Sequence, residues 1–330
     1  MARISLHDAQ DVAGAALIRN GAAGPVAQSV AGALVRADAD GFKGHGLGRL
    51  PSYVAQLRAG KINASARIRP SRPRPGTLLV DADHGFAYPA LDLATGALPD
   101  MARSQGIACA AIARSHHCGA AGLFAETLAR QGLIALLFAN TPAAMAPWGG
   151  NRAVFGTNPI AFACPRGAQD DPIVIDMALS RVARGNIAAA ARRNQAIPPD
   201  WAFDSDGQPT TDAKRALEGT MAPLGDAKGI ALALMVELLA AGMTGSNYAA
   251  EASSFLDAEG PPPGTGQFLV AIDATAFAPD ATDRFAALAR AIEGQEGARL
   301  PGARRFAMRA EAERQGIELG DDLMREIAAL

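Results

Sequence analysis

The sequence is poor in aromatic residues and cysteine, and it contains no long apolar run. Aromatic residues make up 5% of the 330 positions, and there are only three cysteines. An odd number of widely spaced cysteines favours reduced thiols over a disulfide framework. Without about 18 uninterrupted apolar residues, or a basic start followed by an apolar run and a cleavage site, neither a membrane span nor a secretory signal is expected. We therefore expect a cytoplasmic protein.

An excess of charge of either sign is also missing. The formal net charge is −2, with both signs scattered along the chain. Such a balance offers no basic surface to nucleic acid or to an anionic membrane, so we expect neither partner. Hydrophobic residues make up 49% of the sequence, mostly small aliphatic ones, which is typical of a compact α/β protein. The length allows one large domain or two ordinary ones.

Several well-known catalytic motifs are absent. No G-x-G-x-x-G lies between a strand and a helix with an acidic residue about 20 positions on, and Gly44-His45-Gly46 is too isolated to count. A P-loop, H-E-x-x-H, G-x-S-x-G and paired C-x-x-C are missing as well. These absences disfavour a Rossmann dehydrogenase, a nucleotide hydrolase, a zinc protease and an esterase.

The pattern along the chain predicts three parts. Two helical patterns between residues 5 and 38 belong to a helical segment, 1–75, and a loop at 70–76, rich in proline, separates it from a strand at 77–81. Residues 76–275 alternate short apolar runs with helical patterns, which favours an α/β sheet, and residues 193–224 form an insertion in it. Residues 276–330 are predicted as a helical C-terminal segment with three helices, packing with the N-terminal part. The expected strands of the middle part are 107–112, 133–138, 159–164, 172–176 and 268–273, and its expected helices are 120–130 and 228–242.

A glycine-dense stretch at 41–51 leads into a helix near Arg49. It places the titratable imidazole of His45 four residues before a guanidinium. If His45 lies at the helix entrance, Arg49 can hold a small carboxylate at two points while His45 exchanges a proton. The alternative is a flexible surface turn.

A second candidate site follows the strand that ends near residue 115. Ser115-His116-His117-Cys118-Gly119-Ala120-Ala121-Gly122 opens a helix with residues too small to block a ligand. Free backbone N–H groups and the positive end of the helix dipole would then face a phosphate. A metal site made of the two histidines and the cysteine is disfavoured, because adjacent side chains diverge. A plain strand-to-helix turn is the other alternative.

Three more stretches are irregular and carry few charges: 140–150, 156–159 and 176–180. Such backbone suits a ligand-facing or buried position. Simple turn chemistry explains the first two equally well, and Asp176 with Ser180 equally suits a helix cap.

Taken together, these segments resemble the type 2 malate/lactate dehydrogenase family, and the resemblance covers nearly the whole chain. The family also contains ureidoglycolate dehydrogenase, diketogulonate reductase and Δ1-piperideine-2-carboxylate/Δ1-pyrroline-2-carboxylate reductase. The matching segments are His45–Pro51, Ser115–Gly122, Ala146–Gly150, Gly156–Ala161, Asp176–Ala178, Ala183–Gly185, Pro223–Gly229 and Leu300–Gly302.

The resemblance implies a non-Rossmann mixed-sheet fold with a core that binds the cofactor, and a homodimer in which NAD(H) or NADP(H) lies in a cleft completed by the partner subunit. It implies His45 as the proton donor or acceptor, and Arg49 and Thr157 as substrate contacts. No metal is expected. The implied cofactor contacts are His117, Cys118, Gly119, Ala120, Ala121, Asp176, Met177, Ala178, Lys228, Arg299, Pro301, Gly302, Arg304 and Arg305.

Within the family, residues 260–267 and 143–145 look most like the cyclic imine carboxylate reductases. We therefore expect reduction of Δ1-piperideine-2-carboxylate or Δ1-pyrroline-2-carboxylate, with oxidation of a 2-hydroxy acid as the alternative. Gly44 and Asn186 depart from the family pattern, and a serine–histidine–carboxylate relay is incomplete here. They also support a third hypothesis, a catalytically silent binding protein. Ala303 replaces the usual glutamate.

The cofactor expectation is NADPH, with NADH as the alternative. Guanidinium groups suit phosphate geometry, so Arg304 and Arg305 are the expected partners of a 2′-phosphate. The competing interpretation of these two arginines is a solvated helix face.

Overall fold

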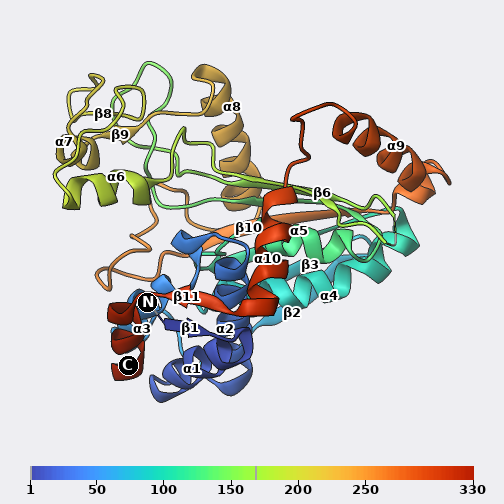
Figure 1. Ribbon diagram of the computed structural model, residues 1–330, viewed down its shortest axis with the longest axis horizontal. Helices are drawn as coiled ribbons and strands as arrows, with labels where there is room; N and C mark the ends of the chain where they lie inside the picture. The colour runs from blue at the N-terminus through green and yellow to red at the C-terminus, as the bar shows by residue number, and fades with distance from the viewer. Residues whose placement is uncertain (1, 168) are drawn as a thin grey trace.

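The computed structural model describes residues 2–167 and 169–330 and is built around one mixed sheet of seven strands (Figure 1). Strands β3 and β4 pair in parallel, and every other neighbouring pair in this sheet is antiparallel. The late strand β10 lies between β4 and β5, so it joins the two halves of the sheet. In spatial order the strands are β2 (Arg69–Arg74), β3 (Thr77–Asp81), β4 (Ile107–Ser115), β10 (Thr265–Ile272), β5 (Ile134–Ala139), β6 (Ile160–Cys164) and β7 (Ile173–Met177).

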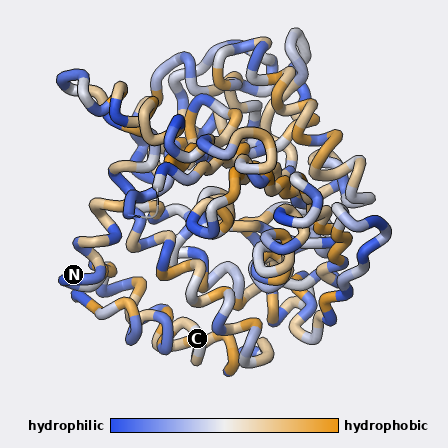
Figure 2. Tube along the Cα trace, turned by 90° about the vertical axis from the view of Figure 1, so that its right-hand side faces the viewer, coloured by the Kyte–Doolittle hydropathy of each residue, from blue (hydrophilic) through white to orange (hydrophobic). Residues whose placement is uncertain are grey.

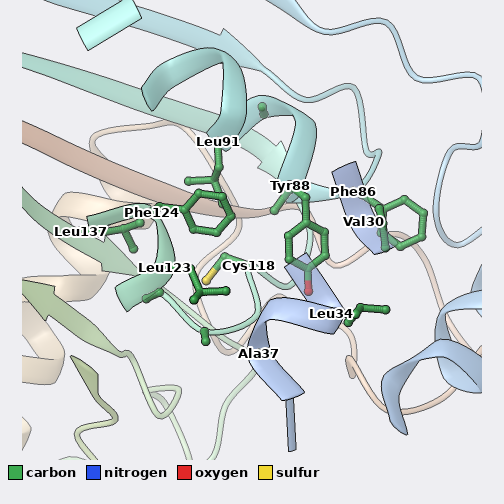
Figure 3. Packing of buried hydrophobic residues seen from close by; sticks show 14 of the residues in the cluster. Val30, Leu34, Ala37, Phe86, Tyr88, Leu91, Cys118, Leu123, Phe124 and Leu137 are labelled. Carbon is green, nitrogen blue, oxygen red and sulfur yellow. The ribbon is translucent and has the colours of Figure 1, made fainter. Parts of the chain in front are cut away.

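Small side chains on the central strands let helices approach the sheet closely. Ala110, Ala135, Ala161 and Ala271 are fully buried in the main core. Helix α4 (Ala87–Gln105) packs on β4, and α5 (Gly122–Ala129) packs on β5 and β6. Figure 3 shows this packing from nearby, with the Tyr88 ring of α4 standing close to α2 and to the Cys118 loop.

The remaining helices surround this layer. The N-terminal part holds α1 (Leu6–Arg19), α2 (Gly24–Ala39), two 3-10 turns, η1 (Lys43–His45) and η2 (Leu47–Arg49), and α3 (Leu50–Arg58). The middle part adds α6 (Arg184–Arg192), α7 (Ala213–Glu218), α8 (Ala227–Val236) and the π-helical turn η3 (Glu237–Gly242). The C-terminal part adds η4 (Ala274–Ala276), α9 (Ala281–Glu293), α10 (Ala303–Gln315) and α11 (Asp321–Ala329).

The two ends of the chain lie side by side. Strand β1 (Ala2–Ile4) pairs antiparallel with β11 (Ile317–Leu319), and α1 packs against α11. Both termini are found at the same end of the molecule in two perpendicular views (Figures 1 and 2). Helix α10 packs on α2, directly before the loop that carries His45. The C-terminal segment therefore supports the start of the chain.

A second apolar cluster lies under α8 and the insertion. It joins Met145 and Leu179 to Ile187 of α6, Met221 of β9 (Thr220–Met221) and Val236 of α8. Strand β9 pairs with β8 (Ala202–Phe203) in a small separate ribbon. The insertion is therefore packed against the sheet and is not a loose loop.

One expectation about secondary structure was wrong. Residues 70–76 were predicted as a breaker-rich loop, but Arg69–Arg74 form β2, and Pro70 pairs with Val80. An edge strand has one side without sheet partners, so prolines are tolerated there. The strands predicted at 77–81, 107–112, 133–138, 159–164, 172–176 and 268–273 are all present, with small differences at their ends. Helix α4 was not predicted.

Of the residues that the structure describes, none belongs to a helix that is both long enough and apolar enough to cross a membrane. The division of the chain at residues 75 and 275 stays a prediction.

Candidate active site

The imidazole rings of His45 and His117 are stacked, with ring centroids 5.2 Å apart and an angle of 25° between the planes. His45 ends the 3-10 turn η1, and His117 follows β4 by two residues. The two glycine-rich segments singled out in the sequence therefore meet in space. Phe255 lies against both adjacent histidines, with ring centroids 5.0 Å from His116 and 5.3 Å from His117, and adds an apolar ring beside His117.

The loop that carries His45 is anchored from both sides. The His45 amide donates to the Phe42 carbonyl at 2.8 Å, which closes η1. The buried Asp38 carboxylate accepts the amide of Leu47 at 2.7 Å. A side chain on Gly46 would collide with that carboxylate, so the residue after the histidine has to be glycine. These bonds favour an anchored loop over the alternative interpretation of the sequence, a flexible surface turn.

Arg49 extends along the same loop, where its Nε donates to the Gly44 carbonyl at 2.8 Å. None of the described carboxylates forms an ion pair with Arg49, which is unusual for a half-buried guanidinium. The charge of Arg49 acts on the neighbouring histidine. Burial, as the larger cause, and the positive charge of Arg49 together lower the pKa of His45 to about 4. The same two causes lower the pKa of His117 well below its ordinary value. Both rings are therefore neutral at pH 7 in the free protein.

The two adjacent histidines have different partners. His117 Nδ1 lies 2.7 Å from Tyr53 Oη, and Tyr53 Oη lies 2.9 Å from Tyr88 Oη. His116 Nε2 lies 2.8 Å from Oε1 of Gln56, which belongs to α3, the helix that also carries Tyr53. Within residues 2–167 and 169–330, no group of three or more histidine, cysteine, aspartate or glutamate side chains could hold a metal ion.

Three of the predicted cofactor segments meet at Asp176. Its Oδ2 accepts the Gly122 amide, at the start of α5, at 2.8 Å, and Arg305 Nη2 donates to the same oxygen at 3.3 Å. The Val174 amide donates to the Pro301 carbonyl at 3.4 Å, which ties β7 to the segment before α10. The first amide of α5 is thus already occupied by a carboxylate. An anion can use only the amides that precede Gly122.

A pocket of about 370 Å³ opens beside this junction, and Arg305 forms part of its wall. Arg305 is 4% exposed and its guanidinium lies 4.7 Å from the centroid of the Phe42 ring. Its Nε and Nη1 are buried and have no hydrogen-bond partner in the described chain. A buried guanidinium with two unused donors suits an anionic or oxygen-rich ligand, so the pocket fits part of a dinucleotide. The lining residues are Asp40, Gly41, Phe42, Val174, Ile175, Asp176, Pro301, Gly302, Arg304, Arg305 and Met308.

The other predicted site residues are distributed around these two centres. Cys118, Gly119, Ala120 and Ala121 are buried between His117 and α5, and Arg304 is exposed at the rim of the pocket. Met177, Ala178, Lys228 and Arg299 are exposed or half-buried and do not line it.

Thr157 is half-buried, and its hydroxyl lies 3.3 Å from that of Thr141. No hydrogen bond within residues 2–167 and 169–330 links Thr157 or Lys228 to His45 or His117. The structure therefore does not join these two predicted residues to the histidine pair.

Sequence reasoning missed Tyr53, Tyr88, Gln56 and Phe42. The first three lie in helices whose apolar faces are buried, so they are indistinguishable from core residues in the sequence. The usable signal was the hydroxyl group of a tyrosine on the apolar face of a helix, because a buried phenol needs a hydrogen-bond partner.

Comparison with known proteins identifies the family of this chain. Residues 4–328 match the family model of malate/L-lactate dehydrogenase. The chain is 47% identical over 326 residues to (2R)-3-sulfolactate dehydrogenase (NADP(+)) of Chromohalobacter salexigens, covering 99% of this chain and 97% of that protein. It is 40% identical to the Δ1-pyrroline-2-carboxylate/Δ1-piperideine-2-carboxylate reductase of Pseudomonas aeruginosa, covering 100% and 99%.

Among solved structures, the Δ1-piperideine-2-carboxylate reductase of Pseudomonas syringae has a TM-score of 0.94 at 36% identity, with 100% of this chain and 99% of that one covered. The mixed-sheet fold expected from the resemblance is confirmed. The expectation of an oxidoreductase is confirmed as well. The chain belongs to the malate/L-lactate dehydrogenase family.

Proposed function

We propose that this protein reduces a cyclic imine carboxylate, Δ1-piperideine-2-carboxylate or Δ1-pyrroline-2-carboxylate, to L-pipecolate or L-proline with NADPH. The observation that carries the proposal is the Arg49 guanidinium near the stacked imidazoles of His45 and His117, which forms no ion pair with any carboxylate that the structure describes. Reduction of a small carboxylate substrate requires a cation that binds the carboxylate and a group that exchanges a proton, and this site places the two next to each other. Arg49 holds the carboxylate at two points and fixes which face of the substrate meets the cofactor.

A substrate with one negative charge fits the charge of the site. Among the described residues, Arg49 is the only cationic side chain that lowers the pKa of both His45 and His117. The Phe255 ring beside His117 offers apolar surface to the methylene groups of a small ring. A substrate with two negative charges needs a second cation at this place.

The nicotinamide cofactor supplies a hydride to the substrate carbon when it is bound. We assign Asp176, Pro301, Gly302, Arg304 and Arg305 to its phosphate-bearing end, supported by the pocket and by the unused donors of Arg305. His117–Ala121, Met177–Ala178, Lys228 and Arg299 stay proposed contacts by family resemblance. NADPH is favoured over NADH because two guanidinium groups border one pocket.

His45 is the proposed proton donor. Its Nδ1 is buried without a hydrogen-bond partner, so no neighbour in the described chain fixes the position of its proton. Pairing of Arg49 with the substrate carboxylate removes one of the two causes that lower the pKa of His45. The imidazole therefore becomes easier to protonate once the substrate is bound. Thr157 stays a proposed substrate contact.

A second candidate function is oxidation of a 2-hydroxy acid. It is favoured by the 47% identity to a sulfolactate dehydrogenase and by the neutral state of His45 in the free protein. A neutral imidazole can accept the hydroxyl proton directly.

We also propose a homodimer located in the cytoplasm. Leu232, Leu234, Leu238 and Met243 project apolar side chains from α8 and the turn that follows it, each 38–55% exposed. In Figure 1, α8 lies on the outer side of the sheet, so a second copy of this chain can reach it. Apolar surface gathered in this way is typical of an interface.

The decisive experiment compares substrates at a fixed protein concentration. NADPH consumption is measured with each cyclic imine carboxylate, and NADP⁺ reduction is measured with 3-sulfolactate, malate and lactate. The proposal expects the highest kcat/KM for a cyclic imine. A higher kcat/KM for a 2-hydroxy acid selects the second candidate, and nicotinamide binding without turnover on any of them selects a silent binding protein.

A further inference from the structure

A buried chain of hydrogen bonds stands behind His117. Tyr53 Oη lies 2.7 Å from His117 Nδ1 and 2.9 Å from Tyr88 Oη. Tyr53 and Tyr88 are 0% and 1% exposed. They come from two different helices, α3 and α4, and Figure 3 shows the Tyr88 hydroxyl end turned toward α2. Two helices thus supply the two phenols of one hydrogen-bond chain, in which Tyr53 alone contacts the ring nitrogen.

The direction of the protons in this chain follows from the available acceptors. Each phenol has one proton to donate, and Tyr88 Oη has no hydrogen-bond partner besides Tyr53 among the residues that the structure describes. The Tyr88 proton must therefore point to Tyr53. Tyr53 then donates its own proton to His117 Nδ1. The opposite direction would leave the Tyr88 O–H buried without an acceptor, at a cost of about 1–3 kcal/mol.

This direction sets the tautomer of His117. Because Nδ1 accepts a proton from Tyr53, the neutral ring carries its own proton on Nε2. Burial raises the pKa of Tyr53 to about 12 and that of Tyr88 above its usual range, so both phenols keep their protons. His117 Nε2–H is then the group left for a ligand, as an uncharged donor.

The two stacked imidazoles consequently differ in what they can do. His45 Nδ1 has no hydrogen-bond partner among the residues that the structure describes, so this nitrogen can gain or lose a proton without breaking a bond to them. His117 can gain a second proton only if Tyr53 gives up its present bond to Nδ1, and the Tyr53 O–H then loses its acceptor. Proton exchange and oriented donation are therefore divided between the two rings.

We propose that Tyr88 and Tyr53 are positioning residues that hold His117 as a neutral Nε2–H donor to an oxygen acceptor of the ligand bound beside His45. The inference rests on the proposed function for the identity of that ligand. A carboxylate oxygen of the substrate and the carboxamide oxygen of the nicotinamide share the required chemistry.

The test uses Tyr53→Phe and Tyr88→Phe as a matched pair, since each removes one buried hydroxyl from the same chain. Histidine ring nitrogens are observed by NMR in the free protein, and a His117→Gln variant assigns the signal among the five histidines. The wild type is expected to show the Nε2–H tautomer. Tyr88→Phe should keep it, because Tyr53 still donates, and Tyr53→Phe should give a mixture of tautomers.

Binding measurements then identify the acceptor. The first arm measures the Kd of pyrrole-2-carboxylate, a planar carboxylate probe, without cofactor, and the second measures the Kd of NADPH alone. Tyr53→Phe is expected to weaken one of the two about tenfold, which corresponds to about 1.4 kcal/mol, and Tyr88→Phe to weaken the same one less. The arm that changes tells whether the oxygen belongs to the substrate or to the cofactor.

Either of two results would overturn the inference: an Nδ1–H tautomer in the wild type, or equal effects of the two substitutions on both tautomer and binding. The wild-type spectrum decides even if Tyr53→Phe fails to fold. The tautomer is measured without turnover, so the inference about His117 can be correct even in a protein that reduces no imine. Failure of the proposed function is therefore recognised separately.

Discussion

The ring of His45 lies over the ring of His117, with 5.2 Å between their centroids, while Arg49 lowers the pKa of both. A carboxylate that pairs with Arg49 therefore changes the acidity of the histidine next to it. In the free protein the pKa of His45 is about 4, so binding of the carboxylate should be accompanied by proton uptake as that pKa rises.

We predict that a small carboxylate binds more tightly as the pH falls from 6 toward 4, with uptake of a fraction of a proton. Calorimetry in buffers of different ionisation enthalpy measures that fraction. His45→Gln should abolish the uptake while the carboxylate still binds. Unchanged uptake in this variant would assign the proton to another group.

His45→Ala should lower turnover by about 10²–10⁴-fold and leave the Kd of NADPH nearly unchanged, because general acid–base catalysis contributes that much. Steady-state kinetics and fluorescence titration with NADPH give the two quantities. His7, an exposed histidine on α1, provides the control as His7→Ala. Wild-type turnover in His45→Ala would remove His45 from the mechanism.

Arg49→Lys should raise KM for the substrate about tenfold or more, since an ammonium group cannot reproduce the planar grip of a guanidinium on a carboxylate. The KM for NADPH should change little. Equal kinetics of this variant and the wild type with every tested acid would show that the carboxylate binds elsewhere.

The two arginines at the pocket should behave differently. Arg304 is exposed, so Arg304→Ala should weaken NADPH about tenfold relative to NADH without lowering Tm. Arg305 is buried against Phe42 and Asp176, so Arg305→Ala should also lower Tm, because it leaves a buried carboxylate unpaired. Affinities for both cofactors and thermal unfolding are measured together. An unchanged preference in both variants contradicts the phosphate assignment.

The buried His116 predicts a pH dependence of stability. Burial lowers its pKa to about 3 from 6.5, so the unfolded chain binds a proton that the folded chain refuses between these values. The contribution of His116 to the free energy of unfolding is fully present above pH 6.5. As the pH falls below 6.5, this contribution decreases by about 1.4 kcal/mol per pH unit. The free energy of unfolding, measured with urea at several pH values between 6.5 and 5, should fall less steeply with pH in His116→Gln than in the wild type. Equal slopes would mean that His116 is protonated in the folded protein.

The sequence predicted the family, the sheet and two separate candidate sites, at residues 41–51 and 115–122, because glycine-dense loops next to titratable side chains leave a local signal. It did not predict that these two segments meet. It could not predict that Asp176 would occupy the first amide of α5, since that bond joins positions 54 residues apart. The buried tyrosines behind His117 were hidden for a related reason. Their helices read as ordinary amphipathic elements, and only tertiary packing turns their hydroxyls toward the imidazole.

The support that α10 gives to the loop carrying His45 has a consequence for synthesis on the ribosome. Arg309 donates two hydrogen bonds, of 2.6 and 2.7 Å, to the carboxylate of Asp40, which lies 269 residues earlier in the sequence. Met308 packs against Gly41. The residues just before His45 are thus translated early, but their supports emerge from the exit tunnel last. A nascent chain that stops before α10 can build most of the sheet while its histidine loop lacks these contacts. Prematurely terminated products should therefore be compact and inactive.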